Sequence, residues 1–255
     1  MRRLFALLLL ASMGCHRGRP TVTPAPVALS ASPAEVDGLW KSALANFRAG
    51  RFAKSAQVLE RLALEFAPGD SRAPEAHFLL AECRLAQGDH LQATREFRKV
   101  SDDTPNNSLA PEALLRAGDA YAELWRRPEL DPTYGQTALA TYQELQNRYP
   151  GTDAADRAKA KTAALQEKFA YKTYRAGLFY FRIKAYDSAI LYLKSVAATY
   201  PRAAVTPAAL IKLVEAYRIL GYQEDLKETC GYLRQFHPDA EGVSGACPTP
   251  PAGAS

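Results

Sequence analysis

A ladder of fixed spacings recurs along the chain and constrains its fold more than any other feature. In one segment a tyrosine, an alanine, a leucine and a proline follow one another at intervals of nine, four and eight residues: Tyr180, Ala189, Leu193 and Pro201. The same three intervals separate the positions Tyr217, Leu226, Cys230 and Pro238. A repeat of this length indicates similar units that stack on one another, because one unit alone cannot bury its apolar face.

Each unit is expected to be a pair of helices. Between residues 32 and 240 the apolar residues recur at three- and four-residue spacing, and Gly or Pro interrupts them at regular intervals. Gly177 stands three residues before Tyr180, so the best segment fits the tetratricopeptide pattern of G-x2-Y, A-x3-F and P. Three earlier units follow the ladder less closely, around Asn46 to Pro68, Arg84 to Pro105, and Tyr121 to Pro150. The sequence therefore predicts an all-α chain, an α-solenoid of five tetratricopeptide-like pairs with about ten helices.

Two irregularities divide this array. The third unit carries eight extra residues in its turn, around residues 126–133. Residues 153–170 contain no helix breaker, so the helix that begins there is expected to be about thirty residues long. We expect one long helix there, between the third and fourth units. The boundaries that follow are units one to three in residues 32–152, and the long helix with units four and five in residues 153–240.

The first residues have the three regions of a secretory signal peptide. Arg2 and Arg3 precede the apolar run of residues 4–10, and the small residues of positions 11–14 follow it. Cys15 comes next and resembles the lipidated cysteine of a bacterial lipobox, so we expect cleavage after residue 14 and a lipid anchor on Cys15. Residues 15–31 are rich in Pro and predict a flexible tether, and residues 241–255 predict a disordered C-terminal tail.

No motif for catalysis or cofactor binding is found. The four histidines are scattered without metal-ligand spacing, and no phosphate-binding loop, nucleophile elbow or dinucleotide fingerprint occurs. The net charge of +5 falls by two when the signal arginines are removed, and the remaining charges are interspersed, which disfavours nucleic-acid binding. We expect a non-enzymatic protein without metal, cofactor or small-molecule substrate.

The cysteines leave two alternatives open. Cys83 is expected to be a small buried residue. Cys230 occupies a core-facing position, and Cys247 lies 17 residues further on in an oxidising compartment. Either the two form a disulfide that pins the tail, or both are free thiols.

The first helices of such an array line its concave face. Their inward positions give a candidate peptide groove, although the aromatic members are equally compatible with ordinary inter-repeat core. The candidate groove residues are Trp40, Leu44, Phe47, Arg48, Phe78, Glu82, Leu85 and Tyr121. Exposed cations expected in the C-terminal half give a candidate partner surface of Arg202, Lys212 and Arg218.

The chain also resembles a known family. Its export signal, Pro-containing tether, five units, lengthened third turn and long helix occur in the order found in the YfiO (BamD) family of outer-membrane assembly lipoproteins, with local similarity in residues 50–69, 127–159 and 185–222. The resemblance implies a lipid-anchored protein at the periplasmic face of the outer membrane. It implies binding to a BamA-like insertase, to other assembly subunits and to the C-terminal targeting strand of unfolded outer-membrane proteins. The alternative is a periplasmic tetratricopeptide adaptor of the Tol-Pal or cell-division coordinator type.

Overall fold

The computed structural model describes residues 31–247, and all regular structure in this part of the chain is helical. The helices follow in chain order: α1 (Pro33–Arg48), α2 (Phe52–Glu65), α3 (Ala73–Ala86), α4 (His90–Asp103), α5 (Ala110–Leu124), α6 (Thr133–Arg148), α7 (Asp153–Arg182), α8 (Tyr186–Thr199), α9 (Thr206–Leu220), α10 (Gln223–Phe236) and α11 (Val243–Ala246). The first helix begins at a capping box, in which Ser32 and Glu35 each accept a hydrogen bond from the other's backbone N–H.

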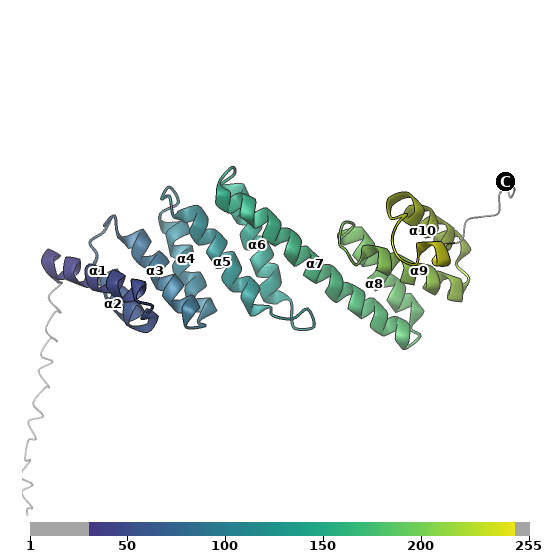
Figure 1. Ribbon diagram of the computed structural model, residues 1–255, viewed down its shortest axis with the longest axis horizontal. Coiled ribbons are helices and arrows are strands. Elements are labelled where there is room, and N and C mark those ends of the chain that lie inside the picture. Colours follow the sequence, from purple (N-terminus) through teal and green to yellow (C-terminus); the bar gives the residue numbers. More distant parts are fainter. Residues whose placement is uncertain (1–30, 248–255) are drawn as a thin grey trace, which may run out of the picture.

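Successive helices form five pairs, from α1 with α2 to α9 with α10, and each pair stacks on the next in a single elongated row (Figure 1). The predicted all-α solenoid is confirmed. Helix α7 is 30 residues long, about 45 Å at 1.5 Å per residue, and it crosses the array obliquely between its two halves (Figure 1).

Small residues allow the two helices of a pair to approach. Ser55, Ala93, Ala138 and Ala189, which hold the small position of the ladder in the first four units, are all fully buried. The hydroxyl of Ser55 donates to the carbonyl of Ala43 on the preceding helix at 3.0 Å. Gly177 lies so close to α8 that a Cβ there would be 2.8 Å from Cδ2 of Leu193, which explains why the ladder needs glycine at this position.

The apolar core runs along the row of helices. Helix α7 contributes to two of its clusters, since Leu165 and Phe169 pack with α5 and α6, whereas Ala170 packs with α8 and α9. The long helix thus joins the core of the N-terminal half to that of the C-terminal half.

The lengthened turn of the third unit, between α5 and α6, packs against α7. Trp125 follows α5 directly, is 1% exposed, and lies against Phe169 of α7 with a ring-centroid distance of 4.4 Å. Two lysines of α7 hold the turn: Lys168 donates to the carbonyl of Trp125, and Lys172 donates to those of Pro128 and Leu130 at 2.9 and 3.0 Å.

The expectation of a disordered tail from residue 241 onward is wrong for its first seven residues. Residues 241–247 fold back on the last pair through α11, and Val243, Ala246 and Cys247 are buried there. The physical reason is a disulfide between Cys230 of α10 and Cys247, the first of the two alternatives left open by the sequence. Cys83 is free and buried, and burial raises the pKa of its thiol.

Candidate functional site

A cavity of about 480 Å³ opens between α1, α2, α3 and α5 in the N-terminal half. It brings together four of the predicted groove residues, Phe47, Arg48, Glu82 and Leu85. The residues that line it are Phe47, Arg48, Phe52, Glu82, Leu85, Ala86 and Arg116. We call this cavity the N-terminal groove.

Two phenylalanines form its apolar wall. Phe47 lies in the last turn of α1 and Phe52 begins α2, and their rings meet edge to face with centroids 5.6 Å apart. The tight turn between them passes through Gly50, whose φ of 68° is one that residues with a Cβ rarely adopt. Both rings are only half-buried, so they offer aromatic surface to a ligand.

Charged groups form the opposite wall. The guanidinium of Arg116 on α5 donates two hydrogen bonds to the Glu82 carboxylate on α3, at 2.7 and 2.8 Å. These hydrogen bonds raise the pKa of Arg116. Asp119 lies 3.8 Å from the same guanidinium and accepts a hydrogen bond from the hydroxyl of Tyr142 at 2.7 Å. Arg116 is therefore committed to protein carboxylates.

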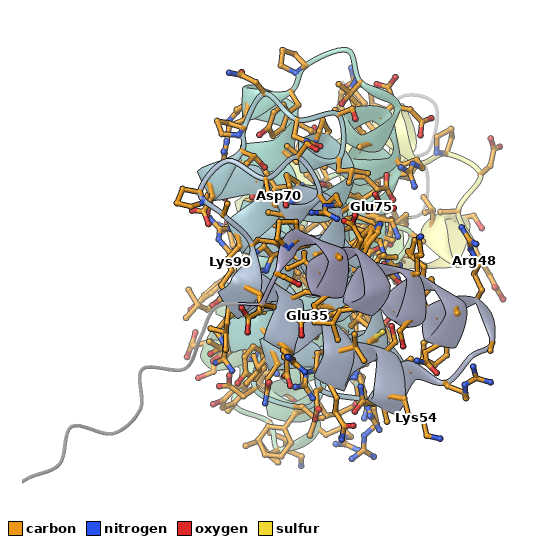
Figure 2. The ribbon with its side chains drawn as sticks, turned by 90° about the vertical axis from the view of Figure 1, so that its left-hand side faces the viewer. Glu35, Arg48, Lys54, Asp70, Glu75 and Lys99 are labelled. Atoms are coloured by element: carbon orange, nitrogen blue, oxygen red, sulfur yellow. A yellow bond between two sulfur atoms is a disulfide. The ribbon has the colours of Figure 1, made fainter. Side chains whose placement is uncertain are left out.

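Arg48 is different, because it projects into solvent from the end of α1, at the rim of the N-terminal groove (Figure 2). An exposed guanidinium beside an aromatic wall is a suitable partner for a carboxylate that carries an aromatic group.

The other predicted groove residues lie elsewhere. Trp40 packs edge to face on Phe66, and Phe78 packs in the same way on Phe97 of α4, with centroids 6.3 and 5.3 Å apart. Tyr121 stacks on Tyr134, and Leu44 is half-buried on α1 outside the lining of the cavity. Neither Trp40 nor Phe78 lines the N-terminal groove.

Sequence reasoning missed three residues of the groove, Phe52, Ala86 and Arg116. Phe52 follows the turn glycine Gly50 by two residues, and Ala86 follows the predicted Leu85 directly. Arg116 lies one helical turn before Asp119, whose carboxylate it approaches.

A second cavity of about 450 Å³ lies on the C-terminal half of α7, beside the lengthened third turn and α8. It combines cationic and aromatic side chains, and Phe179 and Ile183 of the same helix end are 49% and 56% exposed. Its lining comprises Pro128, Glu129, Lys172, Thr173, Arg175, Ala176, Phe179, Arg182 and Tyr192. We call it the α7 surface.

The three predicted partner cations are dispersed. Arg202 is exposed in the turn before α9. Lys212 is half-buried, pairs with Glu215 at 2.5 Å and lies over the ring of Phe181, so the expectation that it is an exposed cation is wrong. Arg218 is exposed but donates to the carbonyl of Ala246.

The expected signal peptide, the lipidated Cys15 and the tether up to residue 30 lie outside the described residues. Between residues 31 and 247 no helix combines the length and apolarity needed to cross a bilayer. The same part of the chain contains no group of His, Cys, Asp and Glu residues that could hold a metal ion.

Comparison with known proteins gives a consistent result. The model of the YfiO family, described as an outer membrane lipoprotein, matches residues 33–232. The outer membrane protein assembly factor BamD of Caulobacter vibrioides is 30% identical over 129 residues, 51% of this chain and 42% of that protein. The protein of the same description from Vibrio cholerae serotype O1 is 30% identical over 112 residues, 44% of this chain and 46% of that protein.

In both cases the matched region spans less than half the length of the curated relative. Among solved structures, a thermophilic TPR protein from Thermus thermophilus is 19% identical with a TM-score of 0.37, over 82% of this chain and 95% of that one.

Proposed function

The chain belongs to the YfiO family of outer membrane lipoproteins, and from this membership we propose that it is a non-enzymatic subunit of the machinery that assembles β-barrels in the outer membrane. Its anchor is a lipid on Cys15, and the helical array extends from the periplasmic face of that membrane. The array offers two surfaces, one for the substrate strand and one for the barrel-forming insertase.

The N-terminal groove binds the C-terminal targeting strand of an unfolded outer-membrane protein. The observation that carries this proposal is the combination of an edge-to-face Phe47–Phe52 wall with the exposed Arg48 at its rim. A strand that ends in an aromatic residue presents a ring and a carboxylate close together, which matches this combination. The ring packs on the phenylalanines, and the terminal carboxylate pairs with Arg48, while Arg116 is held by Glu82.

A titration of a fluorescent peptide with a C-terminal aromatic residue tests this assignment. Phe47→Ala is expected to weaken binding by about 2 kcal/mol, or roughly 30-fold, because truncating a central aromatic anchor has that typical effect. Phe236→Ala is the matched control, since Phe236 is an aromatic of α10 that is 56% exposed and far along the row from the groove.

Amidation of the C-terminus of the peptide tests the contribution of the terminal carboxylate separately from that of the aromatic ring. We expect the amide to weaken binding to the wild type and to have no further effect on Arg48→Gln. Equal affinity of Phe47→Ala and wild type for the acid peptide would exclude the N-terminal groove as the strand site.

The α7 surface is the docking site for the insertase. Three cations, Lys172, Arg175 and Arg182, line this surface with one carboxylate, that of Glu129, which lies 3.8 Å from Arg175. The excess of positive charge favours an acidic partner with apolar groups for Phe179. Arg202 adds a further exposed cation in the same half of the chain.

A pull-down of the insertase with charge-reversal variants tests this docking. Arg182→Glu is expected to reduce recovery and to make it more sensitive to salt, whereas Arg95→Glu, an exposed arginine of α4, leaves recovery unchanged. Loss of the insertase from Arg95→Glu and not from Arg182→Glu would assign the partner to the N-terminal half.

Fractionation tests the anchor. Cys15→Ser is expected to move the protein from the membrane to the soluble periplasmic fraction in cells that lack the insertase. Unchanged membrane partition of that variant would contradict lipidation at Cys15.

A further inference from the structure

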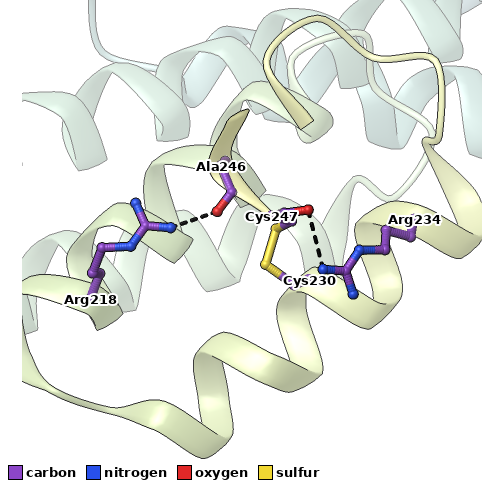
Figure 3. The surroundings of a disulfide bond; sticks show 5 residues. All are labelled: Arg218, Cys230, Arg234, Ala246 and Cys247. Carbon is purple, nitrogen blue, oxygen red and sulfur yellow. Dashed lines mark hydrogen bonds between the residues drawn. A yellow bond between two sulfur atoms is a disulfide. The ribbon is translucent and has the colours of Figure 1, made fainter. Parts of the chain in front are cut away.

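The C-terminal segment, residues 242–247, lies against the end of the array and is fastened there. Cys247 is bonded to Cys230 of α10, and the Cα atoms of the pair are 5.4 Å apart (Figure 3). Val243, Ala246 and Cys247 are buried against α9 and α10 in the core cluster that also holds Ile211 and Leu226. We call this segment the C-terminal cap, because it covers part of the last helix pair.

Two arginines bind the backbone of the cap. The guanidinium of Arg218 on α9 donates to the carbonyl of Ala246 at 2.6 Å, and that of Arg234 on α10 donates to the carbonyl of Cys247 at 3.1 Å (Figure 3). The same two side chains line a cavity of about 360 Å³ with Leu226, Lys227 and Cys230. This end of the array therefore has the composition of a peptide-binding site: two donors for consecutive carbonyls beside apolar side chains.

Noncovalent contacts alone hold the cap weakly. Helix α11 has four residues, far fewer than an isolated helix needs for stability, and both arginines that bind the cap are exposed to water. The disulfide closes a loop with a sequence separation of 17 residues. Closing a loop of that length favours the closed form on the order of 100-fold in the chain-entropy description.

We propose that the C-terminal cap is an intramolecular ligand of the site formed by Arg218 and Arg234, and that the Cys230–Cys247 disulfide is the latch that keeps it bound. A dithiol opens the latch by two thiol–disulfide exchanges. It transfers two electrons and two protons, leaves Cys230 and Cys247 as thiols, and itself becomes a cyclic disulfide. The released cap uncovers the two carbonyl-binding arginines together with Ile211 and Leu226.

Hydrogen exchange of the full chain tests the latch. The amides of Ala246 and Cys247 donate within the cap, to the carbonyls of Gly242 and Val243, and the amide of Ala189 in α8 reports on the array itself. We expect exchange at Ala246 and Cys247 to become about 100-fold faster after dithiol treatment, and equally fast in the variant with both Cys230→Ser and Cys247→Ser. Exchange at Ala189 is expected to stay the same.

Chemical modification of arginine tests the recognition of the cap. Phenylglyoxal is expected to modify Arg218 several-fold faster once the latch is open, and Arg202, which is exposed in the turn before α9, at one rate throughout.

Unchanged exchange at Ala246 and Cys247 after reduction would overturn the proposal, because the cap would then stay bound without its latch. Faster exchange at Ala189 would also overturn it, because the disulfide would then stabilise the whole half of the array. An unchanged rate of modification at Arg218 would exclude it as a partner of the cap.

Discussion

Replacing Gly177 by alanine tests the packing register of the array at its tightest point in the C-terminal half. The Cβ of an alanine there would lie 2.8 Å from Cδ2 and 2.9 Å from Cγ of Leu193, closer than carbon atoms pack. Leu193 is fully buried, so its side chain has no free space into which to turn. Overpacking of this kind costs about 1–3 kcal/mol.

The helix propensity of alanine acts in the opposite direction. An alanine in the interior of a helix is more favourable than glycine by about 0.5–1 kcal/mol. The difference between the midpoints of these two ranges is a net loss of about 1 kcal/mol for Gly177→Ala. Each kcal/mol lowers the thermal midpoint by about 2–4 °C in a chain of this size.

Gly231 is the matched control. It lies in α10, in the same half of the array, and a Cβ there would meet nothing within 4 Å. Gly231→Ala is therefore expected to raise the midpoint by the propensity gain alone. Thermal unfolding followed by far-UV circular dichroism measures both variants. A midpoint for Gly177→Ala at or above that of the wild type would show that α7 and α8 do not pack in the register described.

Three further perturbations test other parts of the fold. Gly118→Ala is expected to destabilise more than Gly177→Ala in the same thermal assay, because its Cβ would meet the buried ring of Tyr142, whose hydroxyl is tied to Asp119; a smaller effect would contradict this packing. Trp125→Ala is expected to cost about 3–5 kcal/mol in urea unfolding, since the ring is buried on Phe169, and a cost below about 1 kcal/mol would mean that the third turn is loose. Burial raises the pKa of Asp102, but hydrogen bonding from Arg148 and the charge of Arg98 outweigh it and hold the pKa below its ordinary 3.8. Since that pKa is lowered by folding, its stabilisation is present above pH 3.8 and is lost as the pH falls through the lower folded value. Asp102→Asn should therefore cost stability at neutral pH, by less than about 1 kcal/mol because the side chain is 43% exposed, and should weaken the loss of stability on acidification; an unchanged pH profile would refute the pairing.

The fold could be predicted from the sequence because the repeated spacing of residues reflects contacts within single helix pairs. The small residues Ala138 and Ala189 and the close approach at Gly177 are properties of one helix pair, and one pair occupies about thirty consecutive residues. The approximate length of α7 was predictable for the same reason, since residues 153–170 contain no helix breaker.

The candidate sites were predictable only in part, because they depend on contacts between distant segments. Phe47 and Phe78 occupy similar inward positions, yet Phe97 of α4 covers Phe78, whereas Phe47 lines the N-terminal groove with Phe52. The burial of Trp125 requires Phe169, which lies in another helix 44 residues later. Arg218 carries no local sign of its partner, because the carbonyl of Ala246 lies 28 residues further along the chain, in the segment that the Cys230–Cys247 disulfide joins to α10.

Photo-crosslinking in living cells tests the central claim, that the N-terminal groove receives the targeting strand of outer-membrane proteins. A photoreactive amino acid at Leu85 lies in the groove, and the same probe at Leu64, which is 88% exposed on α2, lies outside its lining. We predict that the probe at Leu85 captures unfolded outer-membrane proteins through their C-terminal peptides, and that the probe at Leu64 does not. Capture of these proteins with equal yield at both positions, or at Leu64 alone, would contradict the account.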